Sequence, residues 1–170
     1  MSMRTLCRDL ANAIPGLIRV NRGKMSLFEV AERASQLGAE KIAIIDRWQG
    51  GPGRINLFKR DGDTLVRVTP SIDISQVLLQ RDLGATRKRI HSVFIDGTDR
   101  GGQEIKALQE TLSDFFRIPV IDPNKASAQF EAAIRISPNS RNRLRLSFYA
   151  LPESIEIGPR ITISHVEWAD

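Results

Sequence analysis

Residues 17–45 carry the pattern that decides the fold class, and they read LIRVNRGKMSLFEVAERASQLGAEKIAII. The apolar stretch Leu17–Val20 predicts a short strand, which leads into the basic loop Arg22–Lys24. Apolar residues at helical spacing then predict a helix over Ser26–Leu37. The nearly continuous apolar run in Lys41–Trp48 is typical of a strand buried on both faces. Strand, helix and strand in succession indicate an α/β protein.

The basic loop lies directly before the start of this helix. Ser26 followed three residues later by Glu29 has the form of a capping box. Free N–H groups, the positive end of the helix dipole and the cations Arg22 and Lys24 would therefore converge on one spot, which suits a phosphate. Most capped helices with a basic residue nearby bind nothing, so an ordinary solvated loop is the alternative.

Elements further along the chain repeat part of this pattern. A helix that leads through Ile-Pro into a short strand occurs at Ile14-Pro15 and again at Ile118-Pro119. We expect strands over His91–Asp96 and, late in the chain, over three further ranges. These are Ala133–Ser137, Arg143–Leu151 and Ile155–Trp168, the last bent at Gly158-Pro159. The sequence therefore predicts a single domain, residues 1–170, built as two similar α/β halves of about 1–89 and 90–170, each a mixed sheet with helices packed on it.

Composition excludes several classes of protein. At 170 residues with 41% hydrophobic residues, the chain can bury one sizeable core. No run is long enough to span a membrane, and Arg4, Arg8 and Asp9 interrupt any apolar N-terminal signal. The single cysteine, Cys7, excludes an internal disulfide, and two histidines supply no metal-ligand cluster. We expect a cytoplasmic protein without a membrane partner, metal, cofactor or small-molecule substrate.

The charge is unevenly distributed. Residues 1–90 carry 16 Lys and Arg against 9 Asp and Glu, residues 91–170 carry 9 against 11, and the net charge is +5. Arginine also outnumbers lysine by 19 to 6. Because a guanidinium contacts phosphate in a bidentate manner and stacks on bases, this bias suits nucleic acid. A biased genomic base composition would produce the same excess of arginine.

Two glycine-rich segments are candidates for a phosphate-binding enzyme site. Gly50–Gly53 has no Gly-Lys-Ser/Thr and is followed by a strand, so it is a hairpin turn rather than a P-loop. The segment Asp96–Gly102 joins a buried strand to a helix, which is a common active-site layout, and Asp96-Gly97-Thr98 resembles part of an aspartyl-phosphate phosphatase motif. The nucleophilic aspartate of that motif would stand at Phe94, so its chemistry fails here.

Cations near turns or on one strand face favour a binding role. In the strand Arg143–Leu151, Arg143 and Arg145 alternate onto the same face as Tyr149, where cations and an aromatic ring can hold a nucleic-acid backbone and stack a base. A solvated outer face produces the same alternation. The candidate RNA-binding residues are Arg19, Arg22, Lys24, Arg47, Arg54, Arg143, Arg145 and Arg160.

Two segments resemble the Brix-domain family of ribosome-biogenesis proteins. The stretch from Arg22 to Leu27 is similar to the Asn-Arg-Gly region near the start of that domain, and Ile157–Ile163 is similar to its closing Gly-Pro-Arg strand. The resemblance extends over about Thr5–Trp168 and is to the compact archaeal type. It implies two halves that each resemble the anticodon-binding domain of class II aminoacyl-tRNA synthetases, and a non-enzymatic role in binding ribosomal RNA precursors.

Three hypotheses follow. The first is an RNA-binding ribosome-biogenesis factor, with ribosomal RNA or its precursors as partner and ribosomal or assembly proteins as further partners. The second is a small α/β phosphate- or nucleotide-dependent enzyme that uses the Asp96–Gly102 loop. The third is a protein-interaction scaffold whose basic face meets RNA without specificity.

Overall fold

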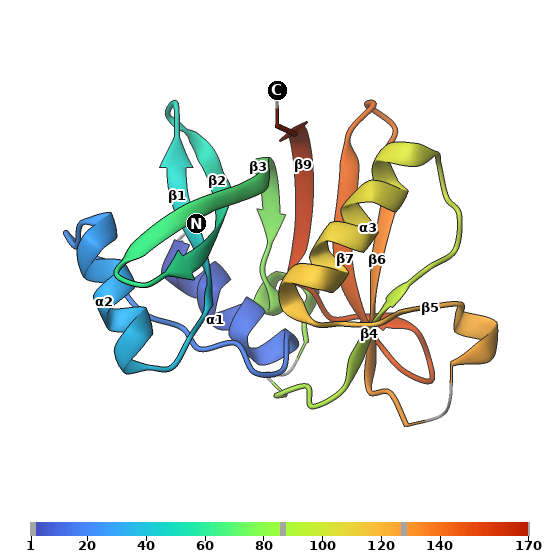
Figure 1. Ribbon diagram of the computed structural model, residues 1–170. Coiled ribbons are helices and arrows are strands. Elements are labelled where there is room, and N and C mark those ends of the chain that lie inside the picture. Colours follow the sequence, from blue (N-terminus) through green and yellow to red (C-terminus); the bar gives the residue numbers. More distant parts are fainter. Residues whose placement is uncertain (1–2, 86–87, 127–128, 170) are drawn as a thin grey trace.

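The computed structural model describes residues 3–85, 88–126 and 129–169, and its strands form one long sheet on which the helices pack (Figure 1). The helices are α1 (Met3–Ala13), α2 (Leu27–Gln36) and α3 (Gln103–Phe116), with short 3₁₀ turns at Gln80–Leu83 and Pro123–Lys125. The strands are β1 (Lys41–Trp48), β2 (Gly51–Asp61), β3 (Thr64–Leu78), β4 (Val93–Asp96), β5 (Val120–Ile121), β6 (Ala132–Pro138), β7 (Leu144–Ala150), β8 (Ile155–Glu156) and β9 (Arg160–Glu167).

The strands form a mixed sheet in the order β1-β2-β3-β9-β7-β6-β4-β5, with β8 beside β7. β4 pairs in parallel with both β5 and β6, and the other pairs are antiparallel. β9, from the end of the chain, lies between β3 and β7 and so joins the early strands to the late ones (Figure 1). The predicted α/β class is confirmed, whereas the division into two similar halves stays a prediction.

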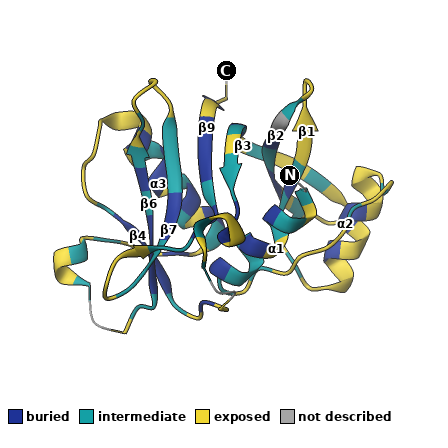
Figure 2. Cartoon of the chain, turned by 180° about the vertical axis from the view of Figure 1, so that it is seen from behind, coloured by how far each residue is buried: buried dark blue, intermediate teal, exposed yellow. Residues whose placement is uncertain are grey.

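Helices cover the β1–β2 part of the sheet on both faces. Residues that alternate along a strand point to opposite faces, so Ile45 packs against the main core while Ile44 packs with Val30 of α2 in a separate cluster. α1 and α3 contribute to the main core, for example through the fully buried Leu6 and Leu108. Figure 2 shows the buried residues along the strands and on the inner faces of these helices, and α2 as the most exposed helix.

Three of the four helices that the apolar spacing predicts are present. The fourth, expected around Ala126–Ala132, is wrong where the structure describes it, because residues 129–131 are turn or irregular and Ala132 begins β6, while residues 127–128 lie outside the described residues. α1 and α3 place their apolar stripes in the main core, as the helical spacing indicated. The cap of α2 is also confirmed, because the Ser26 hydroxyl accepts a hydrogen bond from the N–H of Glu29 at 3.2 Å. The bend expected at Gly158-Pro159 separates β8 from β9.

Two predictions about strands are wrong. Leu17–Val20 is not a strand, and Ile18 and Val20 are 64% and 41% exposed. β1 is the edge of the sheet, and Ile44 is its one buried residue, so it is not a strand buried on both faces. The physical reasons differ. Leu17–Val20 is apolar, but no strand of the described chain supplies it with hydrogen-bond partners. β1 does pair with β2, but it lies at the edge of the sheet and its last three residues extend into solvent.

Candidate nucleic-acid interface

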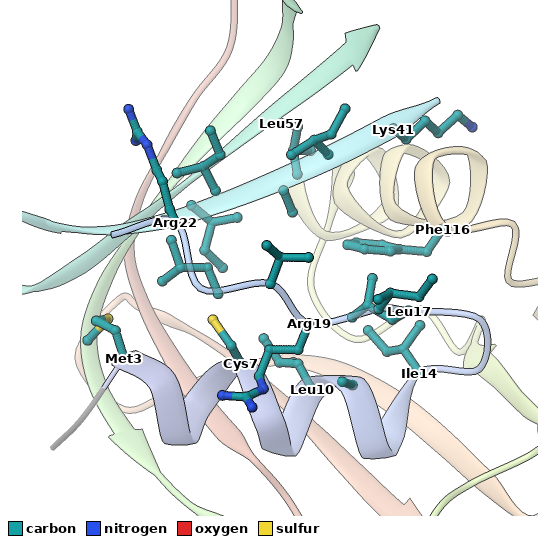
Figure 3. Close-up of a pocket in the computed structure, with 18 of the residues that line it drawn as sticks. Met3, Cys7, Leu10, Ile14, Leu17, Arg19, Arg22, Lys41, Leu57 and Phe116 are labelled. Atoms are coloured by element: carbon teal, nitrogen blue, oxygen red, sulfur yellow. The ribbon is translucent and has the colours of Figure 1, made fainter. Parts of the chain in front are cut away.

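Three of the predicted site residues lie on one segment beside an open cavity. Arg19, Arg22 and Lys24 line a cavity of about 700 Å³ between α1, residues 16–25 and β1. Figure 3 shows the segment running between α1 and β1, with the Arg22 side chain at one end of β1 and the Arg19 side chain directed toward α1. The structure therefore places these three cations around one cavity, and their role in RNA binding stays a prediction.

Arg22 holds this loop in place. Its Nε donates a hydrogen bond to the Met25 carbonyl at 3.0 Å, and its Nη1 lies 3.3 Å from Asp46 Oδ2. Gly23 adopts φ +56°, a left-handed conformation that turns the chain toward α2 at little steric cost. Arg22 is thus a structural residue of the loop, although 34% of its side chain stays exposed.

Arg19 and Lys24 are the free cations of this segment. Both are exposed, and within the described ranges of the chain neither is within ion-pair distance of a carboxylate. Arg47 is also exposed, and it follows Asp46, the residue that Arg22 contacts, on β1. Arg19, Lys24 and Arg47 therefore carry charges that no carboxylate of the described chain neutralises by direct contact.

Arg54 is engaged inside the protein. It is 7% exposed, its guanidinium stacks 4.4 Å from the Trp48 ring centre, and it forms ion pairs with Asp73 and Glu167. Its Nε lies 3.4 Å from Asp73 Oδ1, outside hydrogen-bond alignment. Because these partners come from β3 and β9, Arg54 fastens β2 to the strands that join the early and late parts of the sheet.

Arg160 is likewise held by a partner. Its guanidinium makes two hydrogen bonds to the Glu156 carboxylate, one of them 2.7 Å from Nε to Oε2. The hydrogen bonds from Arg160 outweigh burial and lower the pKa of Glu156, and the Ser147 hydroxyl adds to the effect. The positively charged end of the Gly-Pro-Arg strand therefore stabilises the β8–β9 bend and does not present a free cation.

The outer face of β7 follows the predicted alternation. Leu144 and Leu146 pack against the core, whereas Arg145 and Tyr149 lie on the other face. The guanidinium of Arg135 on β6 covers the Tyr149 ring at 4.4 Å from its centre, so one face of that ring is already occupied. Arg143 is exposed in the turn before β7. Sequence reasoning missed Arg135, which the alternation of Ala133–Ser137 could have placed on this face.

Asp96 is the centre of a second network. Its carboxylate is 2% exposed, and Oδ1 accepts hydrogen bonds from the Thr98 N–H at 2.9 Å and the Thr98 hydroxyl at 2.6 Å. Oδ2 lies 3.2 Å from Arg135 Nε and 3.4 Å from Arg100 Nη2. Burial by itself raises the pKa of Asp96, but the Thr98 hydrogen bonds and the two guanidinium groups outweigh it and lower the pKa.

This network joins Asp96 to the loop that follows β4 and to Arg135 of β6. Both carboxylate oxygens are already occupied, and the Gln109 amide donates to the Asp96 backbone carbonyl at 3.1 Å, which ties the strand end to α3. In the part of the chain that the structure describes, no group of three His, Cys, Asp or Glu is placed to hold a metal ion. Nor does any described helix have the length and apolar character needed to cross a membrane.

The fold and the candidate site define a mixed-sheet α/β protein with two exposed, unpaired cations, Arg19 and Lys24, among the described residues on the segment before α2. No protein-family model matches the chain. Three curated archaeal proteins do, and each is named probable Brix domain-containing ribosomal biogenesis protein. The chain is a homologue of these Brix-domain proteins, so the resemblance found in the sequence is confirmed.

The relatives differ in how much of the chain they match. The Methanopyrus kandleri protein is 26% identical over 165 residues, which is 93% of this chain and 84% of that protein. The Aeropyrum pernix protein is 31% identical over 80 residues, 47% of this chain and only 44% of the relative. The Sulfurisphaera tokodaii protein is 31% identical over 58 residues, 34% of this chain and 33% of the relative.

The fold itself is shared with a solved structure. The crystal structure of a probable ribosomal biogenesis protein from Aeropyrum pernix K1 matches with a TM-score of 0.76 at 21% identity. The match covers 99% of this chain and 90% of that one. The whole arrangement of strands and helices is therefore a known fold.

Proposed function

We propose that this chain is a non-enzymatic ribosome-biogenesis factor that binds ribosomal RNA or its precursors. The observation that carries the proposal is the likeness to the Methanopyrus kandleri protein, which is named for ribosomal biogenesis and matches 93% of this chain. The basic surface at the start of α2 supports RNA as the partner, because phosphate contacts supply much of the affinity of proteins for nucleic acids.

The contact surface that we propose comprises Arg19 and Lys24 on the segment before α2, and Arg47 near the end of β1. These side chains are exposed and unpaired within the described residues, so binding RNA would not require breaking an ion pair of the protein. Arg22 contributes to the same surface while it fixes the loop. Arg143 is exposed and offers a second contact from the β6–β7 turn.

The other three predicted cations have structural partners or partial burial. Arg54 and Arg160 are held in ion pairs, and Arg145 is half-buried with its Nε enclosed. Their loss would act first on the fold, so they make poor probes of RNA binding. The enzyme hypothesis receives no comparable support, because the Asp96 carboxylate on which it rests is fully engaged inside the protein.

The proposal is tested by reversing the free cations of the loop and leaving Arg22 intact. Arg19→Glu combined with Lys24→Glu should weaken binding to structured ribosomal RNA fragments by more than about ten-fold at about 150 mM salt. The slope of log affinity against log salt should fall by about two, one for each lost phosphate contact. Fluorescence anisotropy titrations at several salt concentrations measure both quantities.

A matched control distinguishes the loss of local contacts with RNA from the effect of a lower net charge. Lys106→Glu with Lys125→Glu makes the same charge change at two exposed positions on α3 and the following 3₁₀ turn. We expect the control to stay within about three-fold of the parent, because exposed charges beyond a Debye length are screened. Equal affinities of the loop variant and the parent would refute the proposed RNA surface.

A further inference from the structure

The β1–β2 hairpin carries an exposed tryptophan. Trp48 is the last residue of β1 and is 41% exposed, although tryptophan is on average a highly buried residue. Its partner on β2 is Gly51, where a side chain would normally pack beside the ring. A Cβ at Gly51 would lie only 3.1 Å from the Trp48 carbonyl oxygen, so the close approach of the strands leaves little room for one. The ring therefore has no cross-strand side chain on that flank.

A buried arginine supports the ring from behind. The Arg54 guanidinium carbon lies 4.4 Å from the Trp48 ring centre and so covers one face of the ring. Arg54 is itself 7% exposed and is held by ion pairs to Asp73 on β3 and Glu167 on β9. The exposed part of Trp48 must therefore be its other face and its edges. Because its support is fixed, the ring is positioned before a ligand arrives, which lowers the entropic cost of binding.

Trp48 lies on the face of the sheet that is turned away from α1. Ile55 of β2 packs in the main core with α1, so its neighbour Arg54 points to the opposite face, where it meets Trp48. Gly53 alternates back to the core side, where a Cβ would lie 3.3 Å from the Sδ atom of Met3. The ring and the start of α1 are therefore on opposite faces of the sheet.

Contacts join this ring to the proposed RNA surface. Asp46, which contacts Arg22 of the loop, lies opposite Arg54 on β2, and Arg54 in turn covers Trp48. The carboxylates that meet Arg22 and Arg54 are thereby paired. Arg47, beside Trp48 in the chain, has no carboxylate within ion-pair distance among the described residues. A phosphate next to the ring would therefore meet an unpaired cation and carboxylates whose charge is already offset.

We propose that Trp48 stacks on an unpaired base of the bound RNA, so that the ligand includes single-stranded nucleotides of a loop or bulge. The inference rests on the RNA-binding role proposed above and specifies the kind of RNA. Unpaired bases stack on aromatic side chains, whereas the bases of a duplex already stack on one another. One supported ring between polar neighbours suits a single planar base.

A protein partner fits this surface less well. A stable protein interface buries about 800 Å² on each partner and has an apolar centre. The neighbours of Trp48 at positions 46, 47 and 49–51 are Asp, Arg, Gln, Gly and Gly, and none adds an apolar side chain. An isolated exposed ring is common on protein surfaces. Trp48 differs from that case in the fixed arginine behind it and the unpaired cation beside it.

Tryptophan fluorescence reports the contact directly. In Trp168→Phe, Trp48 is the only tryptophan of the chain, and acrylamide should quench its emission in the free protein. A synthetic stem–loop RNA with a loop of unpaired adenosines should quench the emission at saturation, whereas a blunt duplex with the same stem should not. Abasic nucleotides in the loop keep the phosphates and remove the bases, so they should abolish the quenching.

Affinities of three variants complete the test. Trp48→Leu keeps an apolar cover on Arg54 but has no π face, and it should weaken stem–loop binding by at least about five-fold at about 50 mM salt. Its salt slope and its affinity for the duplex should equal those of the parent, because no phosphate contact is lost. Trp48→Phe keeps an aromatic face and should retain most of the affinity. Ile155→Ala truncates an exposed apolar side chain on β8 and should stay within about two-fold.

The outcomes distinguish this inference from the function on which it rests. If Arg19→Glu with Lys24→Glu weakens RNA binding while Trp48→Leu and the abasic loop leave it unchanged, the RNA-binding role stands and the stacking inference is overturned. The exposed ring would then be available to a protein partner. If the parent binds neither these RNAs nor ribosomal RNA fragments, both proposals fall.

Two further results would overturn the stacking inference alone. The ring is already covered if acrylamide does not reach Trp48 in the free protein. A purely structural role of Trp48 would weaken binding to the stem–loop and to the duplex equally in Trp48→Leu. The fluorescence measurement leaves Trp48 unaltered, so it decides the question even if Trp48→Leu fails to fold by circular dichroism.

Discussion

Replacing Asp96 with asparagine tests whether the role of its carboxylate is structural or catalytic. The side chain is 2% exposed, and the substitution keeps its size while removing its charge. Asparagine can still offer one oxygen to the Thr98 hydroxyl and N–H, but its NH₂ group would then face the guanidinium groups of Arg135 and Arg100, where donors meet donors. We therefore expect Asp96→Asn to destabilise the fold without removing any activity.

The magnitude follows from the two ion pairs. A hydrogen bond to a charged group contributes about 1.5–3 kcal/mol, and the pair with Arg135, at 3.2 Å and 23% exposure of the arginine, is the stronger. The pair with Arg100 is longer, at 3.4 Å, and 38% of that arginine is exposed. Because solvent screens this pair, its contribution to the free energy of unfolding is small. We expect a loss of about 2.5 kcal/mol, which for a chain of this size lowers Tm by about 5–10 °C.

Urea denaturation followed by circular dichroism measures this loss at pH 7 and at lower pH. The pKa of Asp96 is lowered in the folded state, so its contribution is complete above the unfolded pKa of about 3.9 and is lost as the pH falls through the folded pKa. The gap between parent and variant should shrink below about pH 4. Asp99→Asn is the control, since Asp99 is exposed and accepts only long hydrogen bonds, 3.4 and 3.5 Å, from Gly101 and Gly102.

An unchanged stability of Asp96→Asn at pH 7 would refute the structural reasoning. Turnover of phosphate esters with magnesium that disappears in the same variant would refute it more directly and favour the enzyme hypothesis. The stability of the variant and the turnover of the parent should therefore be measured together, because only the two results in combination distinguish a structural from a catalytic carboxylate.

Two further substitutions test the β8–β9 bend. Gly158→Ala should cost about 1–3 kcal/mol in urea denaturation, because Gly158 has φ +71° and an added Cβ would lie 2.8 Å from Leu83 Cδ1; a midpoint equal to the parent would contradict this. Glu156→Gln should cost about 1 kcal/mol at pH 7, since Arg160 and Ser147 both donate to the half-buried carboxylate. The pKa of Glu156 is lowered, so this cost should fade as the pH drops below about 4.3, and a constant cost from pH 7 to pH 3 would count against the pairing.

Local signals in the sequence predicted the helices well. The start of α2 follows from Ser26 and Glu29 alone, because a capping hydrogen bond joins residues three apart and needs nothing from the rest of the chain. The alternation of Leu144, Leu146 and Phe148 identified the core face of β7 for a similar reason. The family resemblance also rested on local motifs, at Arg22–Leu27 and Ile157–Ile163.

The role of each cation could not be predicted in the same way. The sequence ranks Arg54, Arg160 and Lys24 alike as basic residues near turns. In the structure Arg54 meets carboxylates 19 and 113 positions away along the chain, whereas Lys24 meets none among the described residues. Ion pairs between residues far apart in the sequence depend on which strands become neighbours, and the periodicity of apolar residues along the sequence does not predict this.

The sequence by itself determined the α/β class, the three helices and the basic loop before α2, because propensity, capping and side-chain alternation act over a few residues. Only the tertiary structure decided that β1 is an edge strand, that Leu17–Val20 forms no strand, and which cations are free. Each of these depends on the partner across a hydrogen bond or ion pair. Such partners are fixed when distant segments pack together, as β9 does between β3 and β7.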